Sequence, residues 1–136
     1  EGSSLEYLCL GVRSDANDKM LFQTAELFGA NYIENSKFVM AYAQDIVRKI
    51  LDFIRKVDHI YVTVDLDGFS SAYAPGVSAS SPMGFSPEVV LESLELIIAS
   101  QKLISIDVAE MNPKYDIDNQ TAKLAASLVH FVMHEI

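Results

Sequence analysis

Cysteine, tryptophan, glycine and proline are scarce in this chain. Its 136 residues include one cysteine, Cys9, no tryptophan, 6 glycines and 4 prolines. A single cysteine excludes a disulfide framework within the chain, and the apolar run around Cys9 predicts a small buried side chain. No apolar run approaches the ~20 residues of a membrane-spanning helix, and the first residues lack the pattern of a signal peptide. We therefore expect a cytoplasmic protein.

Basic residues are also few. There are 10 lysines and arginines against 19 aspartates and glutamates, which gives a formal net charge of −9. This balance argues against binding to nucleic acid or to anionic membrane surfaces, since both would repel the chain. Half of the residues are apolar, enough to bury the core of one domain. The composition fits a protein that handles cations or small polar molecules.

Apolar periodicity and turn residues predict alternating strands and helices. We expect strands at 5–10, 60–65 and 103–108, and helices at 15–28, 36–57, 86–100 and 119–136, while 32–33 is too short to assign. Asp15, Ser86 and Asn119 are the expected helix caps. Alternation of this kind predicts a parallel sheet covered by helices, with long loops at 68–85 and 109–118.

Two acids end the strand at 60–65, in the order Asp65-Leu66-Asp67. Residues i and i+2 of an extended chain point to the same side, so the carboxylates lie roughly 6–7 Å apart. At an effective dielectric of about 20 they repel by roughly 3 kcal/mol, which a proton or a divalent cation such as Mg²⁺ or Mn²⁺ would relieve. The alternative is structural: Asp67 begins a turn with Gly68, and Asp65 caps a neighbouring loop.

A third acid follows the strand at 103–108. If the two strands are parallel neighbours, Glu110 lies at the same edge as the aspartate pair and can bind a cationic group of a substrate. The alternative is a solvated loop acid. Asp107, within the strand, either supports the site residues or is a buried acid that faces a helix terminus.

The histidines and the long loop give weaker signals. His130 and His134 have the i, i+4 spacing of a zinc pair but lack the glutamate of a zinc protease, so an amphipathic helix end is the alternative. His59 precedes its strand, at the end opposite the acids. The loop has no phosphate-binding motif, and no histidine is placed to activate its serines.

Three segments together resemble the signature motifs of the ureohydrolases, the family of arginase, agmatinase and formimidoylglutamase. They are TVDLDGF at 63–69, APG at 74–76 and DVAEMNP at 107–113. The resemblance implies a three-layer α/β fold, with a parallel sheet and helices on both faces. It also implies two manganese ions that activate water for attack on an amidine or guanidine carbon. Asp65 and Asp67 match metal ligands, and Glu110 matches the residue that binds the substrate cation; no further catalytic residue is assigned.

Within this family the loop is most similar to formimidoylglutamase, through the stretch APGVSA at 74–79. Ser70 and Ser71 replace the Asp-Pro of arginases and agmatinases, and Ala79 stands where they have threonine. The implied substrate is a small amidine, N-formimidoyl-L-glutamate, which water converts to glutamate and formamide in histidine breakdown. An arginase-type or agmatinase-type guanidine hydrolase and a non-catalytic α/β binding module are the alternatives. We also expect a homo-oligomer.

The family's other metal ligands, a histidine in a glycine-rich turn and an Asp-x-His-x-Asp cluster, do not occur in this sequence. We therefore expect residues 1–136 to be the C-terminal portion of a single arginase-like α/β domain with part of the metal site. We expect the isolated chain to bind Mn²⁺ poorly, to turn over no substrate and to self-associate.

Overall fold

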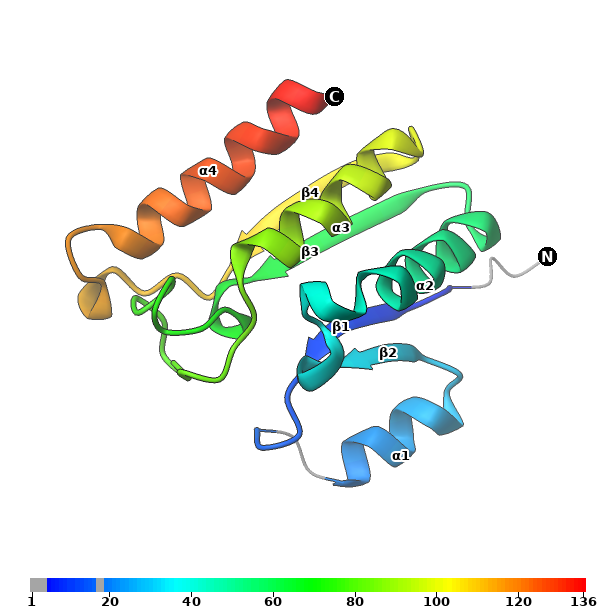
Figure 1. The fold of residues 1–136 in the computed structure, drawn as a ribbon, viewed down its shortest axis with the longest axis horizontal. Coiled ribbons are helices and arrows are strands. Elements are labelled where there is room, and N and C mark those ends of the chain that lie inside the picture. Colours follow the sequence, from blue (N-terminus) through cyan, green and yellow to red (C-terminus); the bar gives the residue numbers. More distant parts are fainter. Residues whose placement is uncertain (1–4, 17–18) are drawn as a thin grey trace.

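The computed structural model describes residues 5–16 and 19–136, and it confirms the alternation of strands and helices (Figure 1). The strands are β1 (Leu8–Val12), β2 (Asn31–Glu34), β3 (Ile60–Asp65) and β4 (Leu103–Ala109), and the helices are α1 (Lys19–Leu27), α2 (Ala43–Lys56), α3 (Pro87–Ala99) and α4 (Gln120–Glu135). Short 3-10 turns lie at Asn35–Lys37, Met40–Tyr42, Leu66–Gly68 and Pro113–Tyr115. No helix in the described part of the chain is long and apolar enough to cross a membrane.

The strands form two parallel pairs, as the alternation predicts. β1 pairs with β2 and β3 pairs with β4, and the two pairs form separate ladders. All four arrows in Figure 1 point toward the same end of the molecule. The carboxyl ends of the strands, where parallel α/β proteins bind ligands, therefore gather on one side.

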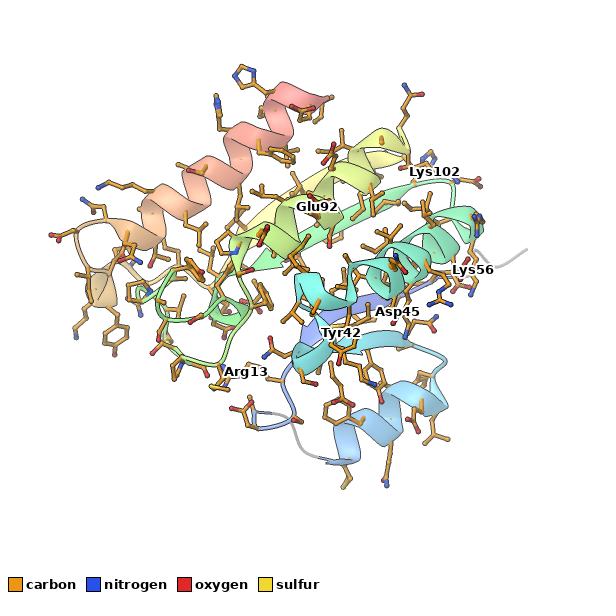
Figure 2. The ribbon with its side chains drawn as sticks, in the orientation of Figure 1. Arg13, Tyr42, Asp45, Lys56, Glu92 and Lys102 are labelled. Carbon is orange, nitrogen blue, oxygen red and sulfur yellow. The ribbon has the colours of Figure 1, made fainter. Side chains whose placement is uncertain are left out.

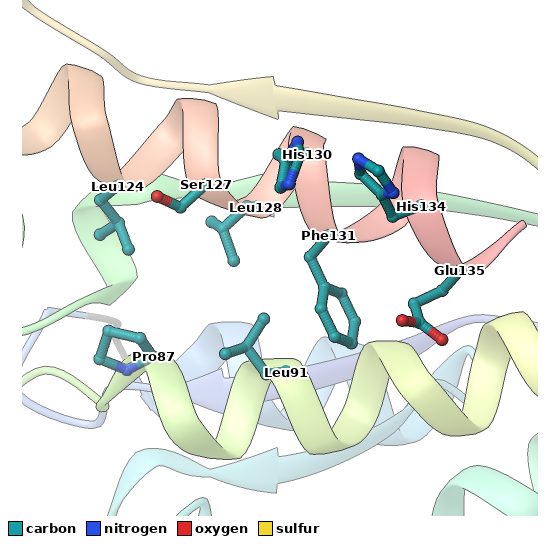
Figure 3. A pocket seen from close by; sticks show the side chains of 9 residues that line it. All are labelled: Pro87, Leu91, Leu124, Ser127, Leu128, His130, Phe131, His134 and Glu135. Atoms are coloured by element: carbon teal, nitrogen blue, oxygen red, sulfur yellow. The ribbon is translucent and has the colours of Figure 1, made fainter.

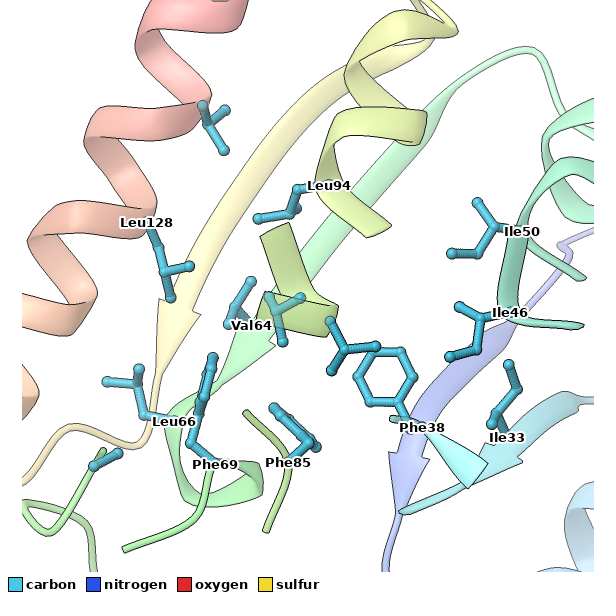
Figure 4. Close-up of a cluster of buried hydrophobic side chains, with 14 of the residues drawn as sticks. Ile33, Phe38, Ile46, Ile50, Val64, Leu66, Phe69, Phe85, Leu94 and Leu128 are labelled. Atoms are coloured by element: carbon cyan, nitrogen blue, oxygen red, sulfur yellow. The ribbon is translucent and has the colours of Figure 1, made fainter. Parts of the chain in front are cut away.

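Helices α2, α3 and α4 lie side by side and cover one face of the strands (Figure 1). Ile46, Ile50 and Ile54 recur every four residues along α2, so they share one face of the helix and are buried. They meet Val64 of β3 and residues from α3 and α4 in a single core (Figure 4). This core fixes the strands whose ends carry the acids.

The two faces of the β3–β4 pair differ. Ile60 and Val64 point toward the helices and are buried, whereas Tyr61 is 60% exposed and Thr63 is exposed too. On β4, Ile104 is 67% exposed. Within residues 5–16 and 19–136, helices thus cover only the inner face of this pair.

The predicted start of the first strand was wrong. Leu5 is 92% exposed, and β1 begins at Leu8 and continues past Gly11 to Val12. Gly11 has a φ of +79°, and a Cβ there would lie 2.5 Å from the Phe85 ring, so the glycine serves close packing within the strand. The sequence did not predict β2, because its four residues are too few to show the alternation of a strand.

The helix predicted at 36–57 was too long. The chain leaves helical conformation at Phe38 and Val39, and α2 begins at Ala43. This break lets Phe38 enter the core, where its ring meets that of Phe85 edge-to-face with centroids 5.3 Å apart. Burial of an aromatic ring outweighs the modest free energy of one more helical turn.

The predicted caps hold their positions only in part. Ser86 and Asn119 precede α3 and α4, but neither side chain accepts a capping hydrogen bond. The Asp15 carboxylate accepts hydrogen bonds from Arg13 instead, and residues 17 and 18, just before α1, lie outside the described residues.

Candidate functional site

The three acids predicted from the motifs lie at one edge of β3–β4. Asp65 is in register with Ala109, so Glu110 follows one residue beyond the paired ends. Leu66, between the two aspartates, is fully buried and anchors the turn that carries them. The parallel pairing on which the placement of Glu110 depended is confirmed.

The acids also interact electrostatically. Burial of part of the Asp65 carboxyl, the charge and hydrogen bond of Asp67, and the charge of Glu110 together raise the pKa of Asp65 to about 6. A carboxyl whose pKa is raised by neighbouring carboxylates holds a proton that a divalent cation can replace. The donor set therefore fits a hard cation with oxygen ligands, such as Mn²⁺ or Mg²⁺.

Glu110 has an unusual backbone conformation, with a φ of 66°. The left-handed region costs a residue with a side chain roughly 1 kcal/mol, so neighbouring contacts must hold it. Met111 forms an antiparallel bridge with Val77, and the Asn112 N–H donates to the Gly76 carbonyl at 2.7 Å. These contacts fix the direction in which Glu110 leaves β4.

The Ala-Pro-Gly loop is held against the start of α4. The Gly76 N–H donates to Thr121 Oγ1 at 2.7 Å, and Thr121 is fully buried. The Asp116 carboxylate accepts from the N–H groups of Thr121, at 2.9 Å, and Ala122, at 3.1 Å, and so caps α4 in place of Asn119. A Cβ at Gly76 would lie 2.6 Å from the Asp116 Cβ, which explains the glycine of the motif.

Phe85 joins the end of β1 to the end of β3. A Cβ at Gly11 or at Gly68 would lie 2.5 Å from its ring, so both glycines let the backbone approach it. The Phe69 ring packs edge-to-face on the other side, with centroids 4.8 Å apart. The carboxyl end of β1 is thereby held near the acids.

Arg13 follows β1 at this same edge, and the sequence motifs did not find it (Figure 2). Its guanidinium donates to the Asp15 carboxylate at 3.0 and 3.1 Å, and its side chain is only 17% exposed. The hydrogen bond that Arg13 donates to Asp15, with the charges of Asp15 and Asp67 adding to it, raises the pKa of Arg13. In the sequence, Arg13 could have been recognised as a basic residue just beyond the end of a predicted parallel strand.

Among the described residues, the acids do not by themselves complete a metal site. Across the described ranges, 5–16 and 19–136, no three histidine, cysteine, aspartate or glutamate side chains gather closely enough to hold a metal ion. Asp65 and Asp67 are therefore candidates for part of a ligand set.

His130 and His134 lie elsewhere, on the part of α4 that runs away from the strand ends (Figure 1). Their ring centroids are 4.2 Å apart, and they line a groove of about 390 Å³ between α3 and α4 (Figure 3). The groove walls are mostly apolar, with Leu91 of α3 and Phe131 of α4 both pointing into the space between the helices. These histidines are not brought to the candidate site.

Asp107 is exposed, so its interpretation as a buried acid was wrong. Thr63 Oγ1 donates to one carboxylate oxygen at 2.6 Å, and the Tyr61 hydroxyl donates to the other. Hydrogen bonds from Thr63 and then Tyr61 lower the pKa of Asp107. It is an anion held in place on the outer face of the sheet.

Comparisons with known proteins agree with this geometry. The profile of the Arginase family matches residues 2–134. A formimidoylglutamase from Clostridium tetani is 41% identical over 136 residues, which are the whole chain but 40% of the relative. The match is to the C-terminal portion.

Solved structures share the fold. A formimidoylglutamase from Bacillus subtilis superposes with a TM-score of 0.85 at 23% identity, over 94% of this chain and 40% of its own. An arginase from Bacillus subtilis superposes with a TM-score of 0.82 at 24% identity, over 93% of this chain and 44% of its own. The chain thus spans less than half the length of these proteins. It has a partial arginase-like fold and belongs to the arginase family.

Proposed function

We propose that this chain is part of a metal-dependent hydrolase that cleaves a C–N bond of a linear amidine. In this proposal Asp65 and Asp67 are ligands of manganese, and Glu110 pairs with the cationic amidinium of the substrate. The observation that carries it is the convergence of the three acids at one strand edge, where partial burial, together with the charges of Asp67 and Glu110, raises the pKa of Asp65. Bound metal would lower the pKa of water and so supply a nucleophile.

The substrate we propose is N-formimidoyl-L-glutamate, which water converts to glutamate and formamide during histidine degradation. The name of the Clostridium tetani relative, at 41% identity, supports this substrate over arginine or agmatine. Glu110 suits any amidinium or guanidinium, since a carboxylate forms charge-assisted hydrogen bonds with both. Arginase-type hydrolysis is therefore the second candidate. We also propose a cytoplasmic homo-oligomer as the native state.

The complete site would need further residues. The complete enzyme would hold two manganese ions, and two carboxylates cannot satisfy two hard cations. We therefore propose that the remaining ligands come from the part of the protein that the Clostridium tetani relative has and this chain does not match. The isolated chain would then be inactive.

The test is a fusion in which the unmatched N-terminal part of the Clostridium tetani relative precedes residue 1 of this chain. The fusion and the isolated chain are each loaded with Mn²⁺ and supplied with N-formimidoyl-L-glutamate, arginine or agmatine. We expect the fusion to release formamide from the first compound, and the isolated chain to release nothing from any of them.

Two variants of the fusion separate the roles. Asp67→Ala should abolish turnover together with bound metal, whereas Glu110→Gln should leave the metal content unchanged and raise KM, because it removes one charge from the substrate's partner. Release of urea from arginine in place of formamide would favour the second candidate. Turnover by the isolated chain would refute the proposal that its site is partial.

A further inference from the structure

His130 and His134 form a pair of imidazole rings on the surface of α4. Both residues are exposed, and their ring centroids are 4.2 Å apart on successive turns of the helix (Figure 3). Side chains at i and i+4 of a helix are neighbours on one face, and two histidines with this spacing can bind one metal ion. The regular helix therefore already brings two metal ligands together.

The surroundings of the pair favour a cation. Within residues 5–16 and 19–136, neither ring takes part in a hydrogen bond or a salt bridge, so no protein group competes for the ring nitrogens. Among the described residues that line the adjoining groove, none is a lysine or an arginine, and Glu135 adds a negative charge. A metal ion would thus meet no nearby positive charge from the groove.

The helix dipole alone gives a poorer account of the pair. A protonated histidine suits the last turn of a helix, where His134 lies. Two protonated rings at i and i+4 would repel each other, because like charges at this spacing destabilise a helix. One divalent cation shared by two neutral rings places positive charge at the same helix end without that repulsion.

We propose that His130 and His134 form a two-histidine site for a divalent transition metal, and for Zn²⁺ in particular. Imidazole is a good ligand for zinc, whereas carboxylates suit manganese. Two protein ligands leave the other coordination positions to water, which agrees with the lack of a third ligand among the described residues. The pair lies on the part of α4 that runs away from the strand ends (Figure 1). The inference therefore stands or falls separately from the proposed hydrolysis.

The first measurement is calorimetric titration of the chain with Zn²⁺. His134→Ala removes one ligand and should weaken zinc binding by about tenfold or more, equivalent to 1.4 kcal/mol. His59→Ala removes an exposed histidine from outside the pair and should leave the affinity unchanged. Equal zinc affinity in the chain and in His134→Ala would overturn the proposal.

The spacing of the pair has its own control. The double variant Val129→His, His130→Val keeps the composition but places the two histidines five residues apart, where they no longer face each other. Val129 is 47% exposed, so the exchange leaves the core intact. This variant should bind Zn²⁺ as weakly as His134→Ala. Undiminished binding would show that the i, i+4 spacing does not create the site.

The second measurement locates the bound metal. Diethyl pyrocarbonate modifies accessible imidazole rings, and mass spectrometry identifies the modified histidines. We expect Zn²⁺ to suppress most of the modification of His130 and His134, and to leave that of His59 unchanged. Mn²⁺ at the same concentration should protect none of the three. Zinc that protects His59 to the same extent as the pair, or that leaves the pair fully reactive, would overturn the proposal.

Discussion

The two faces of the β3–β4 pair differ in how far other parts of the described chain cover them. On the inner face, Val64 and its neighbours pack against three helices and complete a core. On the outer face, Tyr61 and Ile104 are exposed around a fixed anion, Asp107. The inner face explains how these residues fold together, whereas the outer face is exposed in the part of the chain that the structure describes.

The exposed face of β3–β4 adjoins the candidate site. Tyr61, Thr63 and Asp65 alternate along β3, so Asp65 lies on the same side of the sheet as the uncovered residues. A layer that covers Tyr61 and Thr63 would end beside the aspartate pair.

The largest effect should come from the inner face. Leu128 of α4 is 1% exposed, so Leu128→Ala should lower the free energy of unfolding by about 2–5 kcal/mol. Ile104→Ala on the outer face removes a side chain of equal size and should change it by less than about 0.5 kcal/mol in the isolated chain. Denaturant unfolding followed by circular dichroism measures both. Similar losses would show that the two faces are equally packed.

The second-largest loss of stability should come from breaking the hydrogen bond between the Ala-Pro-Gly loop and α4. Thr121→Val keeps the shape but leaves the Gly76 N–H without its acceptor in a buried place, which should cost about 1–3 kcal/mol. Thr121→Ser keeps the hydroxyl and should cost less. The same unfolding experiment compares them. If serine is as damaging as valine, the methyl group and not the hydrogen bond holds the loop.

The acid cluster should make stability depend on pH in metal-free protein. The pKa of Asp65 is about 6 in the folded chain, above the value of about 3.9 in unfolded chains. Between these values the folded state binds more protons than the unfolded state, so this group's contribution to stability falls as pH rises from about 4 to 6. Asp65→Asn in EDTA should therefore gain about 2–4 °C in Tm over the original chain between pH 4 and pH 7. A gap in Tm that does not change with pH would show that Asp65 titrates normally.

The smallest effect concerns association through the outer face. We expect the isolated chain to self-associate in sedimentation, and Ile104→Lys to weaken association by about tenfold, equivalent to 1.4 kcal/mol. Met133→Lys on α4 makes the same change at an equally exposed position and should have little effect. A chain that stays monomeric would refute the expected self-association. A stronger effect of the α4 variant would show that the chain associates through α4 and not through the outer face of β3–β4.

Much of the site could be predicted because it is local. Asp65 and Asp67 are two residues apart, and the parallel strands that bring Glu110 beside them follow from the alternation of strands and helices. The family resemblance rested on these segments. Their roles as ligands and substrate partner stay predictions.

The rest depended on contacts between distant residues. The packing of Phe38 against Phe85 shortened the predicted helix, and no local pattern reports such a contact. Arg13 belongs to the edge only because Phe85 draws the end of β1 toward β3. Of the two interpretations of Asp107, the buried acid was wrong, because the side chain lies on the exposed face of the sheet and accepts hydrogen bonds from Tyr61 and Thr63 of the neighbouring strand.

The most direct test of the central claim is calorimetry of Mn²⁺ binding to the isolated chain, to the fusion and to each with Asp65→Ala and Asp67→Ala combined. If the chain carries only part of the site, it should bind Mn²⁺ weakly, the fusion should bind two ions tightly, and the double variant should lose this gain. Tight binding to the isolated chain that disappears in the double variant would contradict the account, because the site would then be complete without further residues.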